Sequence, residues 1–278
     1  MDRPLLTELI AALALFYAWS FAQLLFVVLH LPPTAATVQV ALVALLFAAR
    51  YVLPSPDPAQ QRRRERGSVR PLGGYWPWTV VAAAAIAVML VVLTGIVAHI
   101  IPSPEPPDER IVAYLAQPRG WVPFAAGALL ADPLVGEVIF RGWVQGRLTR
   151  DLGPEVAIVN TAALYAIANL DLPFVPTNLV LGLACGYAVY LTGSIWSAVL
   201  TSAALNAAML VATGPLPWFD LRKDFFADAR TIAGGAGVMV VSGAVAAFAF
   251  HRLKLRRDAE FAAAAERDAQ AAAARAPD

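Results

Sequence analysis

A carboxylate and a guanidinium stand four residues apart, at Glu137 and Arg141, inside an apolar stretch of the chain. Residues spaced by four lie on one face of a helix, one turn apart. Ionisable groups at membrane depth are costly, so they usually face the protein interior or a water-filled cavity. A carboxylate in such a place can also serve as a general base that activates water. This pair is therefore the first candidate for a functional site.

Two further pairs of polar residues repeat the same spacing downstream, Tyr165 with Asn169 and Ser202 with Asn206. Lipid offers no hydrogen-bond partner, so polar groups on neighbouring membrane helices must satisfy one another. We expect three helices to bring the three pairs around one cavity. The spacing by itself favours a purely structural role: an intrahelical ion pair in the first helix, and asparagines that link helices. Both interpretations stay open at this point.

The helices that carry these pairs belong to an integral membrane protein. The 278 residues are 59% hydrophobic and only 15% charged, with a mean hydropathy of +0.62, against about 45–50% and about 25% in a soluble domain. A membrane-spanning helix needs roughly 20 apolar residues. The sequence predicts an all-α, multi-pass transmembrane bundle of about eight spans, near residues 8–30, 35–53, 76–101, 121–145, 154–170, 176–191, 194–213 and 231–251.

Composition divides the chain into four parts. Residues 1–53 read as a two-helix membrane hairpin, and 54–75 as an Arg-rich cytoplasmic linker. Residues 76–251 hold the other six spans and nearly all the intramembrane polar groups, while 252–278 read as an Ala-rich cytoplasmic tail. The first span has no convincing cleavage site, so we interpret it as a retained anchor instead of a signal peptide.

Basic residues concentrate in three places, 62–70, 147–150 and 252–257, which an eight-span topology puts on one side. Because cytoplasmic loops are enriched in Lys and Arg, we expect a cell-membrane protein with both termini in the cytoplasm. The acidic segment 102–110 falls on the opposite side. Membrane lipid is an expected partner, and the arginines at 62–70 also fit anionic lipid. The net charge of +1 gives no indication of nucleic-acid binding.

The sequence predicts no metal site and no cofactor. Its one cysteine, Cys185, excludes a disulfide framework or a Cys-based metal site within one chain and reads as a small core residue. The predicted core offers one glutamate, whereas a divalent metal prefers imidazoles or several carboxylates. Gly182 and Gly186 form a face of small residues suited to close helix packing.

Residues 120–210 resemble the CPBP family of intramembrane proteases, also called the CAAX-protease and bacteriocin-processing or Abi family. The family motifs are EExxxR, FxxxH, and HxxxN or HxxxD, and their order and spacing are reproduced here. The matching segments are Gly136-Glu137-Val138-Ile139-Phe140-Arg141-Gly142, Tyr165-Ala166-Ile167-Ala168-Asn169, Gly182-Leu183-Ala184-Cys185-Gly186, Tyr190, Thr192-Gly193-Ser194-Ile195-Trp196 and Ser202-Ala203-Ala204-Leu205-Asn206.

The chain departs from the family pattern at three positions expected to be catalytic. Gly136 stands where the family has the glutamate that is the usual candidate to activate water, and Asn169 and Ser202 stand where it has histidines. Asparagine and serine do not titrate, so they cannot replace histidine in proton transfer. The motif positions that still match are Glu137, Arg141, Tyr165 (in place of Phe) and Asn206.

The resemblance and its departures together favour a catalytically degenerate member that binds a membrane peptide, a lipidated protein tail or a partner helix. Arg141, Tyr165, Asn169 and Ser202 are the expected binding residues, and whether the chain is an enzyme stays open. The alternative is an active CAAX-type endopeptidase with a rearranged site, in which Glu137 is the base and Asn206 the oxyanion donor.

Helix geometry weakens the enzyme alternative. Glu137 lies about 100° around the helix axis from position 136, so we expect it to point elsewhere. A lipid or small-molecule transporter is a further alternative, and it is weaker because the sequence shows no inverted repeat or broken-helix pair.

Overall fold

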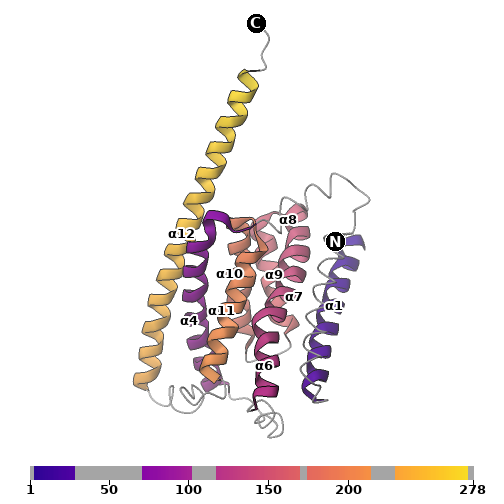
Figure 1. Ribbon diagram of the computed structural model, residues 1–278, viewed down its shortest axis with the longest axis vertical. Coiled ribbons are helices and arrows are strands. Elements are labelled where there is room, and N and C mark those ends of the chain that lie inside the picture. Colours follow the sequence, from indigo (N-terminus) through magenta and orange to yellow (C-terminus); the bar gives the residue numbers. More distant parts are fainter. Residues whose placement is uncertain (1–2, 29–70, 102–116, 170–173, 214–228, 275–278) are drawn as a thin grey trace.

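The computed structural model describes residues 3–28, 71–101, 117–169, 174–213 and 229–274, and every regular element in these ranges is a helix (Figure 1). The elements are α1 (Arg3–Val28), η1 (Gly73–Tyr75), α4 (Trp76–Ile100), α6 (Pro118–Ala126), η2 (Gly127–Ala131), α7 (Asp132–Glu137), η3 (Val138–Gln145), α8 (Gly146–Leu152), α9 (Pro154–Ala168), α10 (Val175–Thr192), α11 (Ile195–Thr213) and α12 (Ala229–Ala273).

The helices form one bundle, with α4 between α12 and α11, and α10 between α9 and α11. A first apolar core joins α4, α10 and α11 through Ile86, Leu90, Leu181 and Ala198, together with the fully buried Cys185. Cys185 is thus the small core residue that its neighbourhood predicts.

A second apolar core attaches α1 to the rest of the bundle. The Phe16 ring contacts the Phe140 ring edge to face at 5.1 Å between centroids, and Phe140 contacts Tyr165 in the same way at 5.2 Å. Such pairs contribute about 0.5–1.5 kcal/mol beyond the area they bury. This ladder of three rings holds α1 beside η3 and α9.

Five of the described helical stretches are long and apolar enough to cross a membrane: Gly73–Ile100, Gly120–Leu152, Val175–Thr192, Ile195–Ala212 and Arg230–Ala273. Leu9–Phe21 and Pro154–Ala168 are shorter apolar helices. The prediction of an all-α, multi-pass membrane bundle is confirmed. The predicted span at 35–53 and most of the predicted linker lie outside the described residues, and the four-part division stays a prediction.

Two turns of the long 118–152 stretch are wound as π-helix, η2 before α7 and η3 after it. π-helical turns are rare and are frequently found at functional sites. Here they flank the short helix that carries Gly136 and Glu137, which places the irregular winding next to the first predicted motif.

Helices α9 and α10 approach each other at the predicted small-residue face. A Cβ added at Gly182 would lie 2.9 Å from both Cα and Cβ of Ala162, and one added at Gly186 would lie 3.0 Å from Oε1 of Gln145 and 3.1 Å from Ile158. The absence of side chains at these two positions lets the backbones pack closely, and it exposes the α10 carbonyls to side chains of η3.

We predict that Gly182→Ala destabilises the bundle, because the new methyl group meets the Ala162 backbone, which cannot move as a side chain can. Overpacking of this kind costs about 1–3 kcal/mol. The matched control is Gly234→Ala in α12, where an added Cβ meets nothing within 4 Å. Thermal unfolding in detergent micelles should show a lower midpoint for the first variant only. Equal midpoints would contradict the close contact.

Candidate functional site

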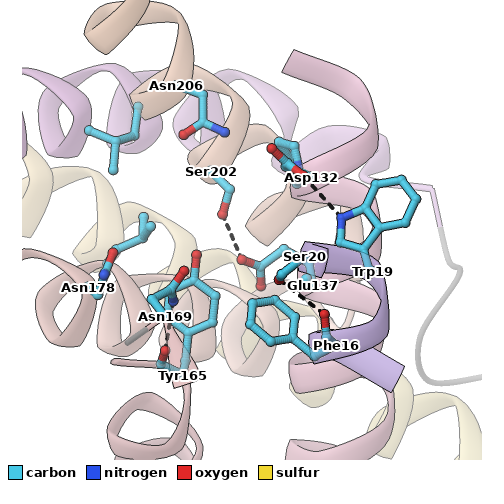
Figure 2. Close-up of a pocket in the computed structure, with 14 residues that line it drawn as sticks. Phe16, Trp19, Ser20, Asp132, Glu137, Tyr165, Asn169, Asn178, Ser202 and Asn206 are labelled. Atoms are coloured by element: carbon cyan, nitrogen blue, oxygen red, sulfur yellow. Dashed lines mark hydrogen bonds between the residues drawn. The ribbon is translucent and has the colours of Figure 1, made fainter. Parts of the chain in front are cut away.

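A cavity of about 290 Å³ lies between five helices in the half of the bundle that α1 covers (Figure 2). The walls come from α1, α7, α9, α10 and α11. The lining residues are Phe16, Trp19, Ser20, Asp132, Pro133, Gly136, Glu137, Tyr165, Asn169, Asn178, Leu181, Ser202, Leu205 and Asn206. The three spaced pairs of the sequence therefore meet at one place, with the exception of Arg141.

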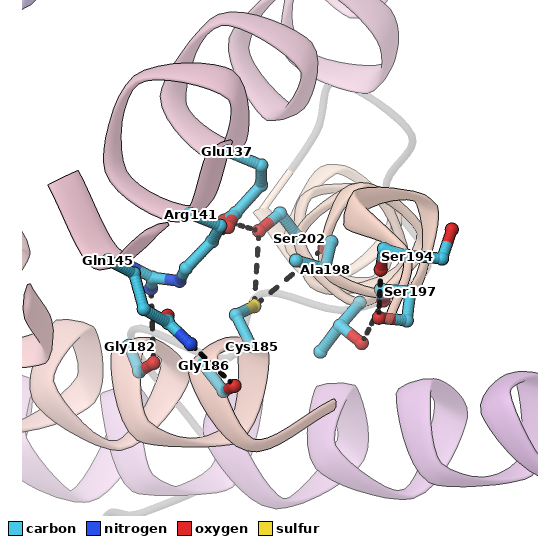
Figure 3. Close-up of polar contacts among 11 residues, drawn as sticks. Glu137, Arg141, Gln145, Gly182, Cys185, Gly186, Ser194, Ser197, Ala198 and Ser202 are labelled. Atoms are coloured by element: carbon cyan, nitrogen blue, oxygen red, sulfur yellow. Dashed lines mark hydrogen bonds and ion pairs between the residues drawn. The ribbon is translucent and has the colours of Figure 1, made fainter. Parts of the chain in front are cut away.

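Glu137 is the most tightly held side chain of this cavity, being only 1% exposed. Its Oε1 accepts a hydrogen bond of 2.6 Å from the Ser202 hydroxyl, and its Oε2 lies 3.2 Å from Nε of Arg141 (Figure 3). Nη2 of Arg141 also donates to the carbonyl of Gly182 at 3.1 Å. Each carboxylate oxygen thus faces a donor, and the charge is neutralised within one helical turn.

Arg141 does not line the cavity, which corrects the expectation that it is a binding residue. It is 2% exposed and lies behind Glu137, directed at α10. The physical reason is that the glycine at 182 leaves its carbonyl within reach, so the guanidinium finds an acceptor in the protein interior. Its guanidinium carbon also lies 5.3 Å from the centre of the Tyr165 ring.

A second layer of polar contacts supports the ion pair from below (Figure 3). Nε2 of Gln145 donates to the carbonyl of Gly186 at 3.0 Å, one turn further along both helices. Sγ of Cys185 lies 3.6 Å from Oγ of Ser202 and 3.7 Å from the carbonyl of Ala198. Helices η3, α10 and α11 are therefore joined through polar groups that the lipid cannot satisfy.

The two asparagines have different surroundings. Asn206 reaches across to η2, where its Nδ2 donates to the carbonyl of Ala128 at 2.7 Å. Asn169 is exposed at the end of α9, and its Nδ2 donates to the carbonyl of Tyr165 at 2.8 Å in its own helix. Tyr165 is half-buried between Phe140 and Arg141. Asn206 links helices, as one of the two open interpretations expects, whereas Asn169 does not.

Gly136 faces the same cavity as its neighbour Glu137. A Cβ added at Gly136 would meet only Cε2 of Tyr165, at 3.9 Å, so the position has room for a side chain. The sequence led us to expect that Glu137 points away from the site of residue 136. That expectation is wrong, since both residues border the cavity. The cavity is broad enough to meet two adjacent positions of α7 that differ by about 100° around its axis.

Sequence reasoning missed Asp132 and the contribution of α1. Asp132 lines the cavity, and its Oδ1 accepts a hydrogen bond of 3.1 Å from Nε1 of Trp19. The signal was present: Asp132 stands four residues before Gly136, so the spacing rule that selected the other pairs also places it on the cavity face. Trp19 carries no such signal, because its contact depends on how α1 packs.

The cavity wall therefore contains two carboxylates, those of Asp132 and Glu137, among amide, hydroxyl and aromatic side chains. In the described ranges no group of three or more His, Cys, Asp or Glu side chains is placed to hold a metal ion. The wall instead offers hydrogen-bond donors and acceptors together with the rings of Phe16, Trp19 and Tyr165.

Comparison with known families agrees with the motifs around this cavity. Residues 118–208, about a third of the chain, match the family model of the Rce1-like, type II CAAX prenyl endopeptidase proteins. The matched stretch carries four of the five cavity walls, and α1 lies outside it. No curated protein matched the chain, and neither did a solved structure. The segment that builds most of the cavity is therefore similar to the Rce1-like proteins.

Proposed function

We propose that this Rce1-like membrane protein is catalytically degenerate and binds a membrane peptide or lipidated protein tail in the cavity without cutting it. The observation that carries the proposal is the state of Glu137. Its two oxygens face the Ser202 hydroxyl at 2.6 Å and the Arg141 guanidinium at 3.2 Å, so the carboxylate serves the bundle. A general base must instead accept a proton from water within hydrogen-bond reach.

The residues around Glu137 support the same conclusion. Ser202, at a position where the family has histidine, donates to the carboxylate and has no titratable group of its own. Asn169, at the other histidine position, is bonded to the backbone of its own helix. The amide of Asn206 is bonded to the carbonyl of Ala128. None of the three supplies the acid–base step that peptide hydrolysis needs.

The cavity suits a short and partly apolar ligand. Its volume of about 290 Å³ lies at the lower end of ligand pockets, which hold about 300–1,000 Å³. That is room for a few side chains or the end of a tail, and too little for a whole helix. Amide groups of Asn178 and Asn206 can bond an extended backbone, while Phe16 and Leu181 provide apolar surface.

One observation favours the second candidate, an active endopeptidase with a rearranged site. Asp132 places another carboxylate on the cavity wall, one helical turn from Gly136, where the family carries its first glutamate. With a water molecule between Asp132 and a bound peptide, Asp132 would act as the general base. The endopeptidase hypothesis therefore requires that loss of the Asp132 carboxylate, and not of the Glu137 carboxylate, ends cleavage.

We also propose that both termini face the cytoplasm. The start of α1, helix α8, whose sequence contains Arg147 and Arg150, and the point where α12 leaves the bundle all lie at the same end of the molecule (Figure 1). Basic residues concentrate on the cytoplasmic side of membrane proteins. Cysteine labelling at positions 147 and 254 in intact cells and in opened vesicles tests it, since labelling from outside intact cells contradicts the orientation.

We predict a strong energetic coupling between Glu137 and Arg141. Glu137→Gln and Arg141→Met should each destabilise the protein by about 3 kcal/mol, because each leaves one buried charge without its partner. The double variant should lose about 2 kcal/mol less than the sum of the two. Ser202→Ala, which removes one hydrogen bond, should cost about 1 kcal/mol. Reversible unfolding in mixed micelles measures all four, and additive losses would contradict a structural ion pair.

We predict that the purified chain binds a farnesylated CAAX-type peptide with a fluorescent label and releases no cleaved product. Gly136→Leu should weaken binding about tenfold, because its side chain enters the cavity. Gly237→Leu, in α12 and outside the central cavity, is the matched control, because an added Cβ there meets nothing within 4 Å, and it should bind as the unchanged chain does. Anisotropy measures binding, and chromatography detects product.

Two outcomes would overturn the proposal. Product that disappears in Asp132→Asn establishes the endopeptidase and ends the degenerate proposal. Equal peptide affinity in the Gly136→Leu and Gly237→Leu variants would show that the peptide binds elsewhere.

A further inference from the structure

A second polar site lies where α12 leaves the bundle, at the end opposite its start. Here arginines of α12 lie over aromatic rings of other helices. The guanidinium carbon of Arg257 is 3.9 Å from the centre of the Tyr190 ring of α10, and 5.2 Å from that of Phe261. Arg252 lies 5.1 Å from the ring centre of Trp78 in α4. Contacts of this kind fix where the guanidinium groups lie.

A pocket of about 680 Å³ opens beside these contacts, between α12 and the ends of α10 and η1. Arg257 and Arg267 contribute its basic groups, Tyr190 and Phe261 its rings, and Gly193 the turn after α10. It shares no lining residue with the central cavity. It is therefore a separate site, and what it binds does not depend on the function of the cavity.

The pocket carries an excess of positive charge. Its one carboxylate, Glu260, pairs with Arg256, Nε to Oε1 at 3.6 Å. Across the described ranges, no carboxylate lies within ion-pair distance of Arg252, Lys254 or Arg257. A negatively charged ligand would therefore supply the counter-charge for Arg257.

The position along α12 indicates the depth of the pocket in the membrane. The helix is apolar from 231 to 250 and becomes basic at Arg252. Tyr and Trp are enriched at membrane–water interfaces. Tyr75, Trp78 and Tyr190 contact the arginines at 252–257, so they lie at the level where α12 becomes basic. The pocket thus begins where the hydrocarbon of the bilayer ends, at the level of the lipid headgroups.

We propose that this pocket binds the headgroup of an anionic phospholipid, with Arg257 donating hydrogen bonds to its phosphate. A guanidinium stacked on a ring keeps its edge N–H groups available, and those groups match phosphate oxygens in pairs. Basic pockets between membrane helices on the cytoplasmic side are suited to such headgroups. Arg267, further out on the same face, contacts the polar end of the headgroup.

Native mass spectrometry of the full chain, released from detergent with phosphatidylglycerol or phosphatidylcholine of identical acyl chains, tests the proposal. The unchanged chain should retain phosphatidylglycerol about tenfold more tightly than phosphatidylcholine. Arg257→Gln should lower the affinity for phosphatidylglycerol about twentyfold, the loss expected for a charge-assisted pair of hydrogen bonds. Lys254→Gln removes the same charge outside the pocket and should lower it at most about fivefold.

Equal losses in the Arg257 and Lys254 variants would overturn the site, because they would show that only the general charge of the helix matters. Absence of any preference for phosphatidylglycerol would overturn it as well. Arg267→Gln guards against misfolding of the Arg257 variant, since the Arg267 side chain is exposed and its loss should leave the fold intact. It should lower the affinity about threefold, and an unchanged affinity would exclude the outer part of the proposed pocket.

Discussion

The structure depends on one buried pair of opposite charges. A carboxylate and a guanidinium within a membrane bundle cannot be left to lipid, so each must find its partners inside the protein. Glu137 and Arg141 do so by using three helices at once: their own, α10 through the carbonyl of Gly182, and α11 through Ser202. Each partner has a sequence requirement, a glycine at 182 and a hydroxyl at 202. The motif that contains Glu137 and Arg141 therefore determines how three helices pack, in addition to any chemistry.

This constraint bears on the proposed loss of acid–base residues, because it gives Glu137 a structural reason to be present. If Glu137 is needed to neutralise Arg141, it is retained for stability whether or not peptide bonds are cut. Positions 136 and 169 carry no such obligation, and there the chain has Gly and Asn. Position 202 does take part in the network, because the Ser202 hydroxyl donates to Glu137. Asp132 is the residue that keeps a catalytic alternative worth testing, because it returns a second carboxylate to the cavity wall.

The fold class and most of the cavity were predictable because both follow from simple periodicities. Runs of about 20 apolar residues predict the helices, and a spacing of four put Glu137, Tyr165, Asn169, Ser202 and Asn206 on faces that do meet. The same rule applied to Asp132 would have added it.

Other contacts were beyond prediction from the sequence. The direction of Arg141 depends on a carbonyl of α10, and the part played by Trp19 depends on where α1 docks. The bond from Asn206 to Ala128 depends on a π-helical turn, which no residue pattern announced. These are facts of tertiary packing, for which a single sequence offers no periodic signal.

Helix α12 has a mechanical consequence. It runs unbroken for 45 residues, which corresponds to about 68 Å at about 1.5 Å per residue, and about 30 Å suffices to cross the hydrocarbon layer. Its glycines, at 234, 235, 237 and 243, all lie in the membrane half, and from 244 to 273 it contains neither glycine nor proline. Because sharp kinks arise at such residues, we expect the outer half to be stiff. A displacement of its far end would then move the part of α12 that packs against α4.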